Sequence, residues 1–349
     1  MRNWNVRRGC AISLLFLAMA FGGLNLLAFR HAHAMLHYAS SGMRTHRPEE
    51  LSIWRKVRVL FSGVTILRPQ GQKTPPSVGL PFVAVTIPST GQVRLGAWFC
   101  PKKDVRCVAI LFHGYGGEKS ALLPEARQLY DLGCAVLLVD FRGSGQSSEA
   151  YTTVGYAEAE DVAAAVTYAR GQWPEARLVL FGQSMGAAAI LRAVGRLGVK
   201  ADGLILEGVF DTMLNTVRHR FESMRVPSFP CAELLVFWGG RQMGFDGFSH
   251  NPADYAADVT CPALVMHGKD DPRARLADAR QVFDQLGGPR KFREFTATGH
   301  EPYVRHHREE WRAAVSGMLE PEFRIQNSAF NQEPGTKNQE PRTPPPTEP

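Results

Sequence analysis

Cysteine is sparse in this sequence. Six cysteines are scattered over 349 residues, and no two have the CxxC spacing. This pattern excludes a disulfide framework, and no cysteine and histidine spacing resembles a zinc site. Cys100 and Cys107 flank a short loop and allow two interpretations, a disulfide in an oxidising compartment or two partly buried thiols. We expect neither a metal nor a cofactor.

Acidic residues are nearly missing from the N-terminal part. Residues 1–73 hold 11 Lys and Arg but only Glu49 and Glu50 as acids, whereas the rest holds 29 basic and 31 acidic residues. The formal net charge of +7 therefore comes from the N-terminal segment, and we expect no nucleic-acid partner. Hydrophobic residues make up 44% of the chain, enough for a large core.

Residues 10–29 contain no charged side chain. As a helix they would be about 30 Å long, the thickness of a bilayer core. We interpret residues 1–30 as an uncleaved membrane anchor. The alternative is a signal peptide, because AHA at residues 32–34 resembles a cleavage site, and the protein would then be secreted. The terminal amine favours N-inside, so we expect the main domain outside the cytoplasm, periplasmic or on the cell surface.

Residues 31–79 form a basic juxtamembrane segment. Within it, residues 48–61 predict an amphipathic helix, whose apolar face holds Ile53, Trp54, Val57, Leu60 and Phe61. Its basic face suits either an anionic membrane surface or water around a helix packed on the domain. At the other end, residues 321–349 are poor in apolar groups and rich in Pro, Asn, Gln and Glu, which predicts a disordered tail.

Strand and helix patterns alternate through residues 80–320. Two runs around a Ser-Thr-Gly turn predict a β-hairpin, and further apolar runs predict buried strands at residues 108–112, 135–139, 178–181, 204–206 and 263–266. Helical patterns lie between them, so we expect a parallel sheet that binds ligands at the carboxyl ends of its strands. Residues 208–260 interrupt the alternation and are rich in Phe, Met and Trp, which predicts an inserted cap.

The strongest chemical signal is GQSMG at residues 182–186. It follows a predicted strand and precedes a helix-forming run of alanines, which is the context of a G-x-S-x-G nucleophile elbow. Gly182 and Gly186 flank the serine because the turn is too tight for side chains. Ser184 is therefore the expected nucleophile.

A serine hydroxyl needs a base, and the expected chain order is Ser, acid, His. His300 lies just past a plausible last strand at residues 292–295 and is the expected base. The loop HGKDDP offers two acids, and its motif register favours Asp271 over Asp270. Asp211 is a more remote alternative.

A second glycine-rich loop, HGYGG at residues 113–117, follows the predicted strand 108–112. Its glycines, Gly114 among them, let backbone N–H groups approach a developing oxyanion. We expect the N–H groups of Tyr115 and Met185 to bind that oxyanion. His113 is expected to support the loop rather than to transfer protons.

The motifs HGYGG, DFRGSGQS, GQSMG, HGKDD and GHE occur in this order. With them, residues 80–320 resemble the α/β-hydrolase superfamily, in its esterase/lipase-like and serine aminopeptidase-like (S33) branch. The resemblance implies a mostly parallel eight-stranded sheet flanked by helices, with a short inserted cap. It also implies a catalytic triad of Ser184, Asp271 and His300. A serine at the elbow argues against the dehalogenase and epoxide hydrolase branches, which use aspartate there.

These residues predict a serine hydrolase that cleaves a carboxylic ester through an acyl-enzyme. Apolar side chains in the cap favour a small-molecule or lipid-like ester, although most of them would equally form the cap's own core. One alternative is an aminopeptidase-like serine peptidase, whose cap acids would bind an ammonium group; Glu222, Glu233 and Asp246 are available. The other alternative is a non-catalytic, membrane-bound scaffold.

Overall fold

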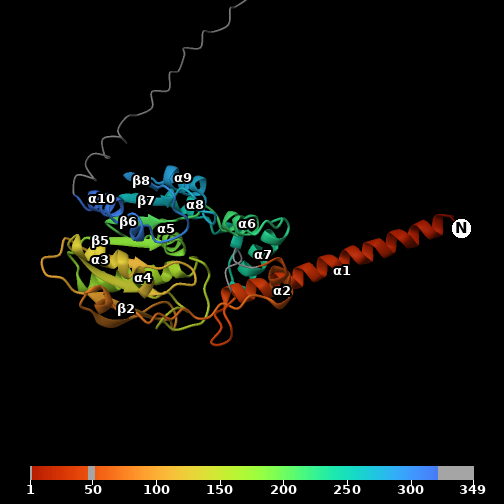
Figure 1. The fold of residues 1–349 in the computed structure, drawn as a ribbon, viewed down its shortest axis with the longest axis horizontal. Helices are drawn as coiled ribbons and strands as arrows, with labels where there is room; N and C mark the ends of the chain where they lie inside the picture. Colours follow the sequence, from red (N-terminus) through yellow and green to blue (C-terminus); the bar gives the residue numbers. More distant parts are fainter. Residues whose placement is uncertain (1, 46–51, 321–349) are drawn as a thin grey trace, which may run out of the picture.

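The computed structural model describes residues 2–45 and 52–320, and its centre is a single eight-stranded sheet (Figure 1). The strand order is β1-β2-β4-β3-β5-β6-β7-β8; β1 and β2 form an antiparallel hairpin, β2 is antiparallel to β4, and the other neighbours are parallel. The prediction of a mostly parallel eight-stranded sheet is confirmed. The strands are β1 Val83–Pro88, β2 Arg94–Cys100, β3 Cys107–Phe112, β4 Cys134–Val139, β5 Leu178–Gln183, β6 Gly203–Glu207, β7 Ala263–Gly268 and β8 Arg290–Phe295.

Helices cover both faces of the sheet. The longer helices are α1 Arg2–Leu36, α2 Ile53–Ser62, α3 Leu123–Asp131, α4 Glu158–Gln172, α5 Met185–Arg196, α6 Met213–Ser223, α7 Cys231–Met243, α8 Pro252–Ala256, α9 Leu276–Gln285 and α10 Arg308–Leu319. Side chains of α4, α5, α8 and α9 share one buried cluster with the sheet, and those of α3 and α10 share the other. Strands β3 and β4 are buried along their whole length, as expected for strands covered on both faces.

The segment between β6 and β7 holds α6, α7, a short 3₁₀ turn at Gly247–Ser249 and α8. Its first two helices, α6 and α7, lie over the end of the sheet where α1 meets the body (Figure 1). We call α6 and α7 the cap helices. The predicted cap at residues 208–260 falls on this segment.

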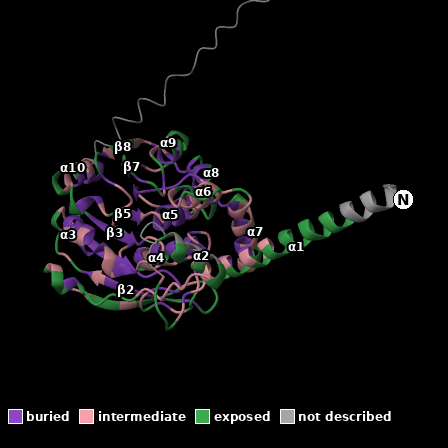
Figure 2. Ribbon diagram, turned by 45° about the vertical axis from the view of Figure 1, so that its right-hand side comes forward, coloured by how far each residue is buried: buried purple, intermediate pink, exposed green. Residues whose placement is uncertain are grey.

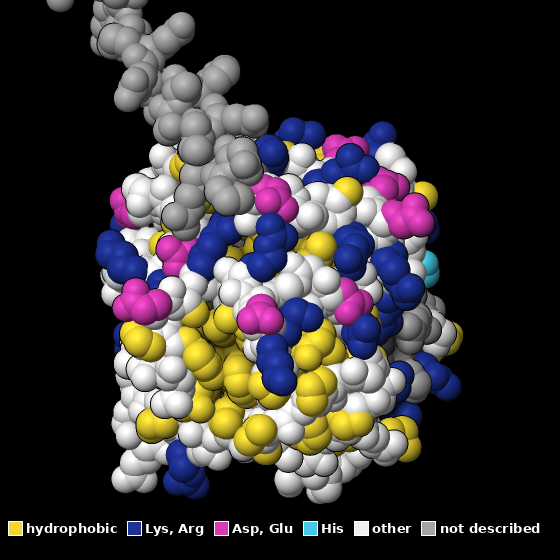
Figure 3. Space-filling view, turned by 90° about the vertical axis from the view of Figure 1, so that its left-hand side faces the viewer, with side chains coloured by type: hydrophobic (Ala, Val, Ile, Leu, Met, Phe, Trp, Pro, Cys, Tyr) yellow, Lys and Arg dark blue, Asp and Glu magenta, His cyan; other side chains and the backbone are white. Residues whose placement is uncertain are grey.

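Helix α1 has two different halves. Residues 11–23, the free half, are exposed throughout and project away from the body (Figure 2). Residues 24–36, the packed half, lie against α7: the Trp238 indole donates to Asn25 Oδ1 at 3.1 Å, and the Gln242 amide donates to the Phe29 carbonyl at 3.0 Å. Residues 11–36 are long and apolar enough to cross a membrane. The opposite face of the molecule carries basic and acidic side chains side by side, with apolar side chains gathered in its lower half (Figure 3).

The cysteine pairing differs from the one considered from the sequence. Cys107 and Cys134 form a disulfide, while Cys100 is a buried free thiol, so the Cys100–Cys107 pairing is wrong. The reason is strand order: β3 and β4 are parallel neighbours, and Cys107 and Cys134 are register partners with Cα atoms 4.7 Å apart. Strand order of this kind cannot be read from cysteine spacing.

The predicted amphipathic helix corresponds to α2, which begins at Ile53. The expected first turn, residues 48–51, lies outside the described residues, and so does the predicted tail at 321–349. Trp54 and Phe61 on α2 are strongly exposed. Helix α2 therefore keeps apolar side chains on the surface beside α1 (Figure 1).

Candidate active site

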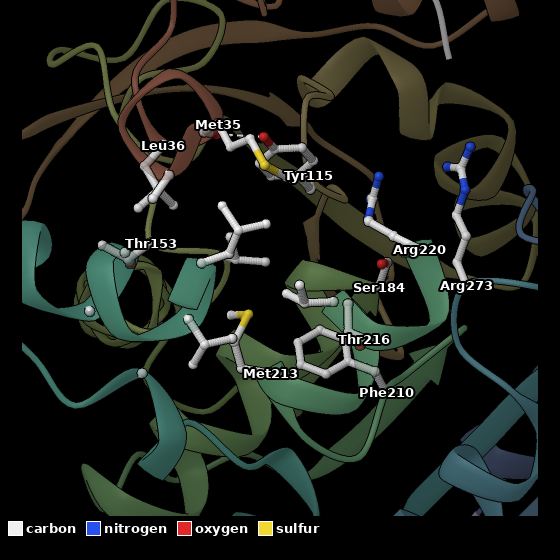
Figure 4. Close-up of a pocket in the computed structure, with 18 of the residues that line it drawn as sticks. Met35, Leu36, Tyr115, Thr153, Ser184, Phe210, Met213, Thr216, Arg220 and Arg273 are labelled. Carbon is white, nitrogen blue, oxygen red and sulfur yellow. Dashed lines mark hydrogen bonds between the residues drawn. The ribbon is translucent and has the colours of Figure 1, made fainter. Parts of the chain in front are cut away.

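Ser184 occupies the turn between β5 and α5. Its dihedrals, φ 52° and ψ −110°, are rare for a residue with a side chain, and such local strain is typical of a nucleophile elbow. A Cβ at Gly182 would lie 2.5 Å from the carbonyl carbon of Gly186, and a Cβ at Gly186 would lie 2.3 Å from the Phe112 carbonyl oxygen. Only glycine fits on both sides, and the turn leaves the Ser184 hydroxyl facing a cavity (Figure 4).

His300 lies between Ser184 and Asp271. Its Nε2 is 3.0 Å from Ser184 Oγ, and its Nδ1 is 2.6 Å from Asp271 Oδ2. These distances join loops that follow β5, β7 and β8, all at the carboxyl ends of parallel strands. An imidazole held in this way can accept a proton from the hydroxyl while the carboxylate stabilises the resulting cation.

The Asp271 carboxylate is buried and well satisfied. Its Oδ1 accepts hydrogen bonds from the backbone N–H groups of Arg273 at 2.8 Å and Ala274 at 3.1 Å. Burial acts to raise the pKa of Asp271, but the hydrogen bond and charge of His300 outweigh it, and the pKa stays below its ordinary value. Asp270 is exposed and does not contact His300, so the geometry brings Asp271 and not Asp270 to the imidazole.

The loop at residues 113–117 lies beside the elbow. A backbone hydrogen bond from Gly117 to Gly114, 3.1 Å long, closes its turn, in which Gly116 has φ +66°. Among the described residues, the backbone N–H groups of Tyr115 and Met185 donate to no protein acceptor. Both are therefore available to an oxygen bound next to Ser184.

His113 is fully buried behind this loop. Its Nε2 accepts a hydrogen bond from the Phe141 N–H at 3.1 Å, and its Nδ1 lies 2.9 Å from the Gly114 carbonyl. Burial lowers the pKa of His113, which favours the neutral imidazole. With both nitrogens engaged by the backbone, His113 is placed to support the loop.

Three other histidines of the domain have partners away from Ser184. His250 is buried, lies 3.1 Å from the Val154 carbonyl, and has its pKa lowered to about 4 by burial. His267 Nε2 lies 2.8 Å from the carbonyl of Ala274, and His219 lies 3.2 Å from Asp278. Neither His219 nor His250 lines the cavity at Ser184.

Ser184 and His300 line a narrow cavity of about 100 Å³, here called the inner cavity. Its walls are mostly apolar, and the cap contributes Phe210 and Met213 (Figure 4) together with Val217, Leu235, Val236 and Phe245. A second cavity of about 650 Å³, the outer cavity, shares Met35, Tyr115, Val217, Leu235, Arg220 and Arg273 with the inner one. The two cavities therefore adjoin along one wall.

Three groups of residues around the site were not foreseen from the sequence. Ala32, Met35 and Leu36 of α1 line the inner cavity, and the Tyr115 hydroxyl donates to the Met35 carbonyl. Arginines line the outer cavity, and two buried acids lie behind the elbow. The sequence carries no signal for the part played by α1, because a stretch that is apolar on all sides marks no contact face.

Comparison with known proteins agrees with this architecture. The sequence model of the serine aminopeptidase S33 family matches residues 103–227. YqkD of Bacillus subtilis is 25% identical over 210 residues, which are 59% of this chain and 69% of YqkD. YfhR of Salmonella typhimurium is 31% identical over 218 residues, which are 60% of this chain and 70% of YfhR.

Among solved structures, the esterase Pf2001 of Pyrococcus furiosus has a TM-score of 0.61 at 23% identity, over 74% of this chain and 98% of the esterase. At that identity the likeness speaks for the fold alone. The sheet order, the elbow between β5 and α5 and the 31% identical relative lead to one conclusion: the chain belongs to the α/β-hydrolase superfamily.

Proposed function

We propose that the protein is a serine hydrolase that cleaves carboxylic esters through an acyl-enzyme. The observation that carries the proposal is the hydrogen-bonded series Ser184, His300 and Asp271, with distances of 3.0 and 2.6 Å. Few arrangements other than nucleophilic catalysis require a strained serine, a histidine and a buried carboxylate in this order.

In the proposed reaction, Ser184 Oγ attacks the ester carbonyl carbon and its proton passes to His300 Nε2. The N–H groups of Tyr115 and Met185 bind the oxyanion of the tetrahedral intermediate. The intermediate then expels the alcohol, which takes the proton from His300. Water repeats the sequence on the acyl-enzyme, releases the acid and returns the proton to Ser184.

An ester substrate is favoured over a peptide by the charge around the site. The description of the family model, serine aminopeptidase, raises the peptidase alternative. An aminopeptidase needs acids near the ammonium group of its substrate, but among the described residues no Asp or Glu lines either cavity. Glu222 and Glu233 are paired with Arg275 and Arg218 instead, and Asp246 caps a 3₁₀ turn.

The packing of α1 supports an uncleaved anchor. Cleavage after residue 34 would remove Ala28 and Ala32, which are buried and line the cavities. We therefore assign α1 as a single-pass anchor whose packed half belongs to the folded domain. The disulfide between Cys107 and Cys134 supports an extracytoplasmic domain, because disulfides persist in oxidising compartments.

The test is hydrolysis by the full-length protein of p-nitrophenyl acyl esters against aminoacyl-nitroanilides. Ester hydrolysis that Ser184→Ala reduces by about 10⁴-fold or more supports the proposal. Preferential cleavage of the nitroanilides would favour the peptidase, and no Ser184-dependent turnover of either would favour the scaffold. The anchor is tested by the intact mass of the protein isolated from the membrane fraction, which we expect to include residues 1–34.

A further inference from the structure

The outer cavity lies where the anchor helix meets the domain. Leu24, Leu27, Ala28 and His31 of α1 and Val59 of α2 line it, and the wall that it shares with the inner cavity leads toward Ser184. Its volume of about 650 Å³ falls within the range of small-molecule sites. A single hollow region thus reaches from the nucleophile to the side of a helix that is apolar enough to cross a membrane.

The length of α1 places the mouth of this cavity at the bilayer boundary. Arg2, Arg7 and Arg8 precede the uncharged part of α1, which begins at residue 9. A bilayer core of about 30 Å that begins there takes up about 20 residues of helix and therefore reaches into the packed half. Leu24 and Leu27 then lie within the hydrocarbon region. Trp54 and Phe61 of α2 and Phe229, two residues before α7, are 81%, 70% and 76% exposed, and exposed aromatic side chains of this kind suit the membrane interface.

Positive charge lines the same cavity. Arg44, Arg220 and Arg273 belong to its walls, and no Asp or Glu among the described residues does. Arg220 and Arg273 lie on the Ser184 side of the site (Figure 4). Burial raises the pKa of the Tyr115 phenol, and the charges of Arg220 and Arg44 oppose that rise, so both charges act within the site.

Two neighbouring arginines show a different arrangement. Arg218 and Arg275 are ion-paired with Glu233 and Glu222 and line neither cavity. Arg44 and Arg220 have no carboxylate partner among the described residues. Guanidinium groups that line an apolar cavity and face no carboxylate of the described residues match a ligand that carries its own anion.

We infer that the substrate is an acyl ester of an anionic membrane lipid, drawn sideways from the bilayer through the gap between α1 and α2. The inference rests on the proposed function. The acyl chain occupies the apolar cavities beneath the cap helices, the ester carbonyl reaches Ser184, and the phosphate of the headgroup lies on Arg220 and Arg44. Attraction of the basic N-terminal segment to anionic lipid acts in the same direction.

The test uses full-length protein reconstituted in vesicles that contain phosphatidylglycerol and phosphatidylcholine with the same acyl chains. Fatty acid release from the two lipids is measured by mass spectrometry. We expect phosphatidylglycerol to be cleaved about tenfold faster, and Arg220→Gln to remove most of this preference. Arg218→Gln, on the same helix but outside the cavities, is the matched control and keeps the preference.

Two further experiments test whether the lipid enters from the bilayer, separately from whether the site recognises its headgroup. Water-soluble dibutyryl phosphatidylglycerol carries the same headgroup, and we expect slower cleavage of it than of the bilayer lipid. Ala28→Trp narrows the outer cavity and lowers the rate on bilayer lipid relative to p-nitrophenyl butyrate. Ala18→Trp, on the free half, leaves that ratio unchanged.

Hydrolysis of p-nitrophenyl butyrate reports on the proposed function alone. If this hydrolysis depends on Ser184 but the two bilayer lipids are cleaved equally, or Arg220→Gln keeps the preference, the inference is overturned while the ester hydrolase stands. Faster cleavage of the soluble lipid would overturn the sideways route. Absence of any Ser184-dependent hydrolysis would remove both proposals.

Discussion

At the scale of single residues, the surrounding structure determines which side chain can take part in catalysis. Asp270 and Asp271 are adjacent in sequence, yet one is exposed and the other is buried against His300. Motif register favours Asp271, and the structure brings that residue to the imidazole. The motif does not reveal why Asp271 is held there: two backbone N–H groups donate hydrogen bonds to its carboxylate.

Asp271→Asn should reduce kcat/KM for a p-nitrophenyl ester by about 10⁴-fold, because the amide no longer stabilises the imidazolium. Asp270→Asn is the matched control, and we expect it to change kcat/KM by less than about threefold, since surface substitutions have small effects. Steady-state kinetics of the two purified variants measure the difference. Equal losses in both would contradict the assignment of Asp271.

Two buried acids, Glu125 and Glu207, lie behind the elbow, and no sequence motif announces them. The Ser184 N–H donates to the Glu207 carbonyl at 2.7 Å, and the Glu207 carboxylate accepts from the Trp311 indole. Burial raises the pKa of Glu125 to about 7. Two causes raise the pKa of Glu207: burial is the larger, and repulsion from Glu125 is the smaller. Which acids are buried depends on packing across the sheet, and local sequence does not contain that information.

For Glu125 the sign of the pH dependence follows from the raised pKa. Below the ordinary pKa of 4.5 both folded and unfolded chains are protonated; as the pH rises toward 7, only the unfolded chain ionises freely, and the folded state loses stability. Glu125→Gln should therefore stabilise the protein more at pH 8 than at pH 5, by about 2–3 kcal/mol. Denaturant unfolding at both pH values measures this difference, with exposed Glu175→Gln as control. The same effect at both pH values would refute the account.

At the scale of elements, the sequence predicts best where one element alone determines the pattern. The buried strands and the elbow are marked by apolar runs and by glycine spacing, and the predicted strand 135–139, for example, corresponds to β4 at Cys134–Val139. The contact of α1 with α7 was missed, because it depends on Asn25, Trp238 and Gln242, which come together only in the folded chain. The neighbour relation of β3 and β4, and with it the disulfide, was missed for the same reason.

The elbow should not tolerate a side chain at Gly186. Gly186→Ala places a Cβ 2.3 Å from the Phe112 carbonyl oxygen, so the turn must shift, and we expect ester hydrolysis to fall by about 10²-fold or more. Gly171→Ala in α4 meets nothing within 4 Å and should stabilise the protein by up to about 1 kcal/mol. Activity and thermal unfolding of both variants test the pair, and an active, stable Gly186→Ala protein would disprove the crowding argument.

At the scale of the whole molecule, the hydrolase domain and the N-terminal helix α1 share one site. The packed half of α1 both contacts α7 and closes the cavities, so the N-terminal helix is part of the architecture of the site. The disulfide joins two central strands separated by 27 residues in sequence. Both features agree with the proposed membrane anchor and the proposed extracytoplasmic domain.

Reduction should destabilise the whole domain. Opening the Cys107–Cys134 bond frees a loop of 27 residues and should cost about 3–4 kcal/mol of unfolding free energy. Denaturant unfolding with and without dithiothreitol measures the loss. The Cys107→Ala, Cys134→Ala double variant should be insensitive to reductant, and a wild-type midpoint that does not move on reduction would argue against the bond.

The proposed chemistry depends on Ser184 being an activated nucleophile, and covalent labelling is a direct measure of that property. Folded full-length protein is treated with a fluorophosphonate, and the modified peptide is identified by mass spectrometry. We expect a stoichiometric adduct on Ser184, none in Ser184→Ala, and slower labelling in Asp271→Asn. A folded wild-type protein that is not labelled, or a Ser184→Ala protein labelled to the same extent, would contradict it.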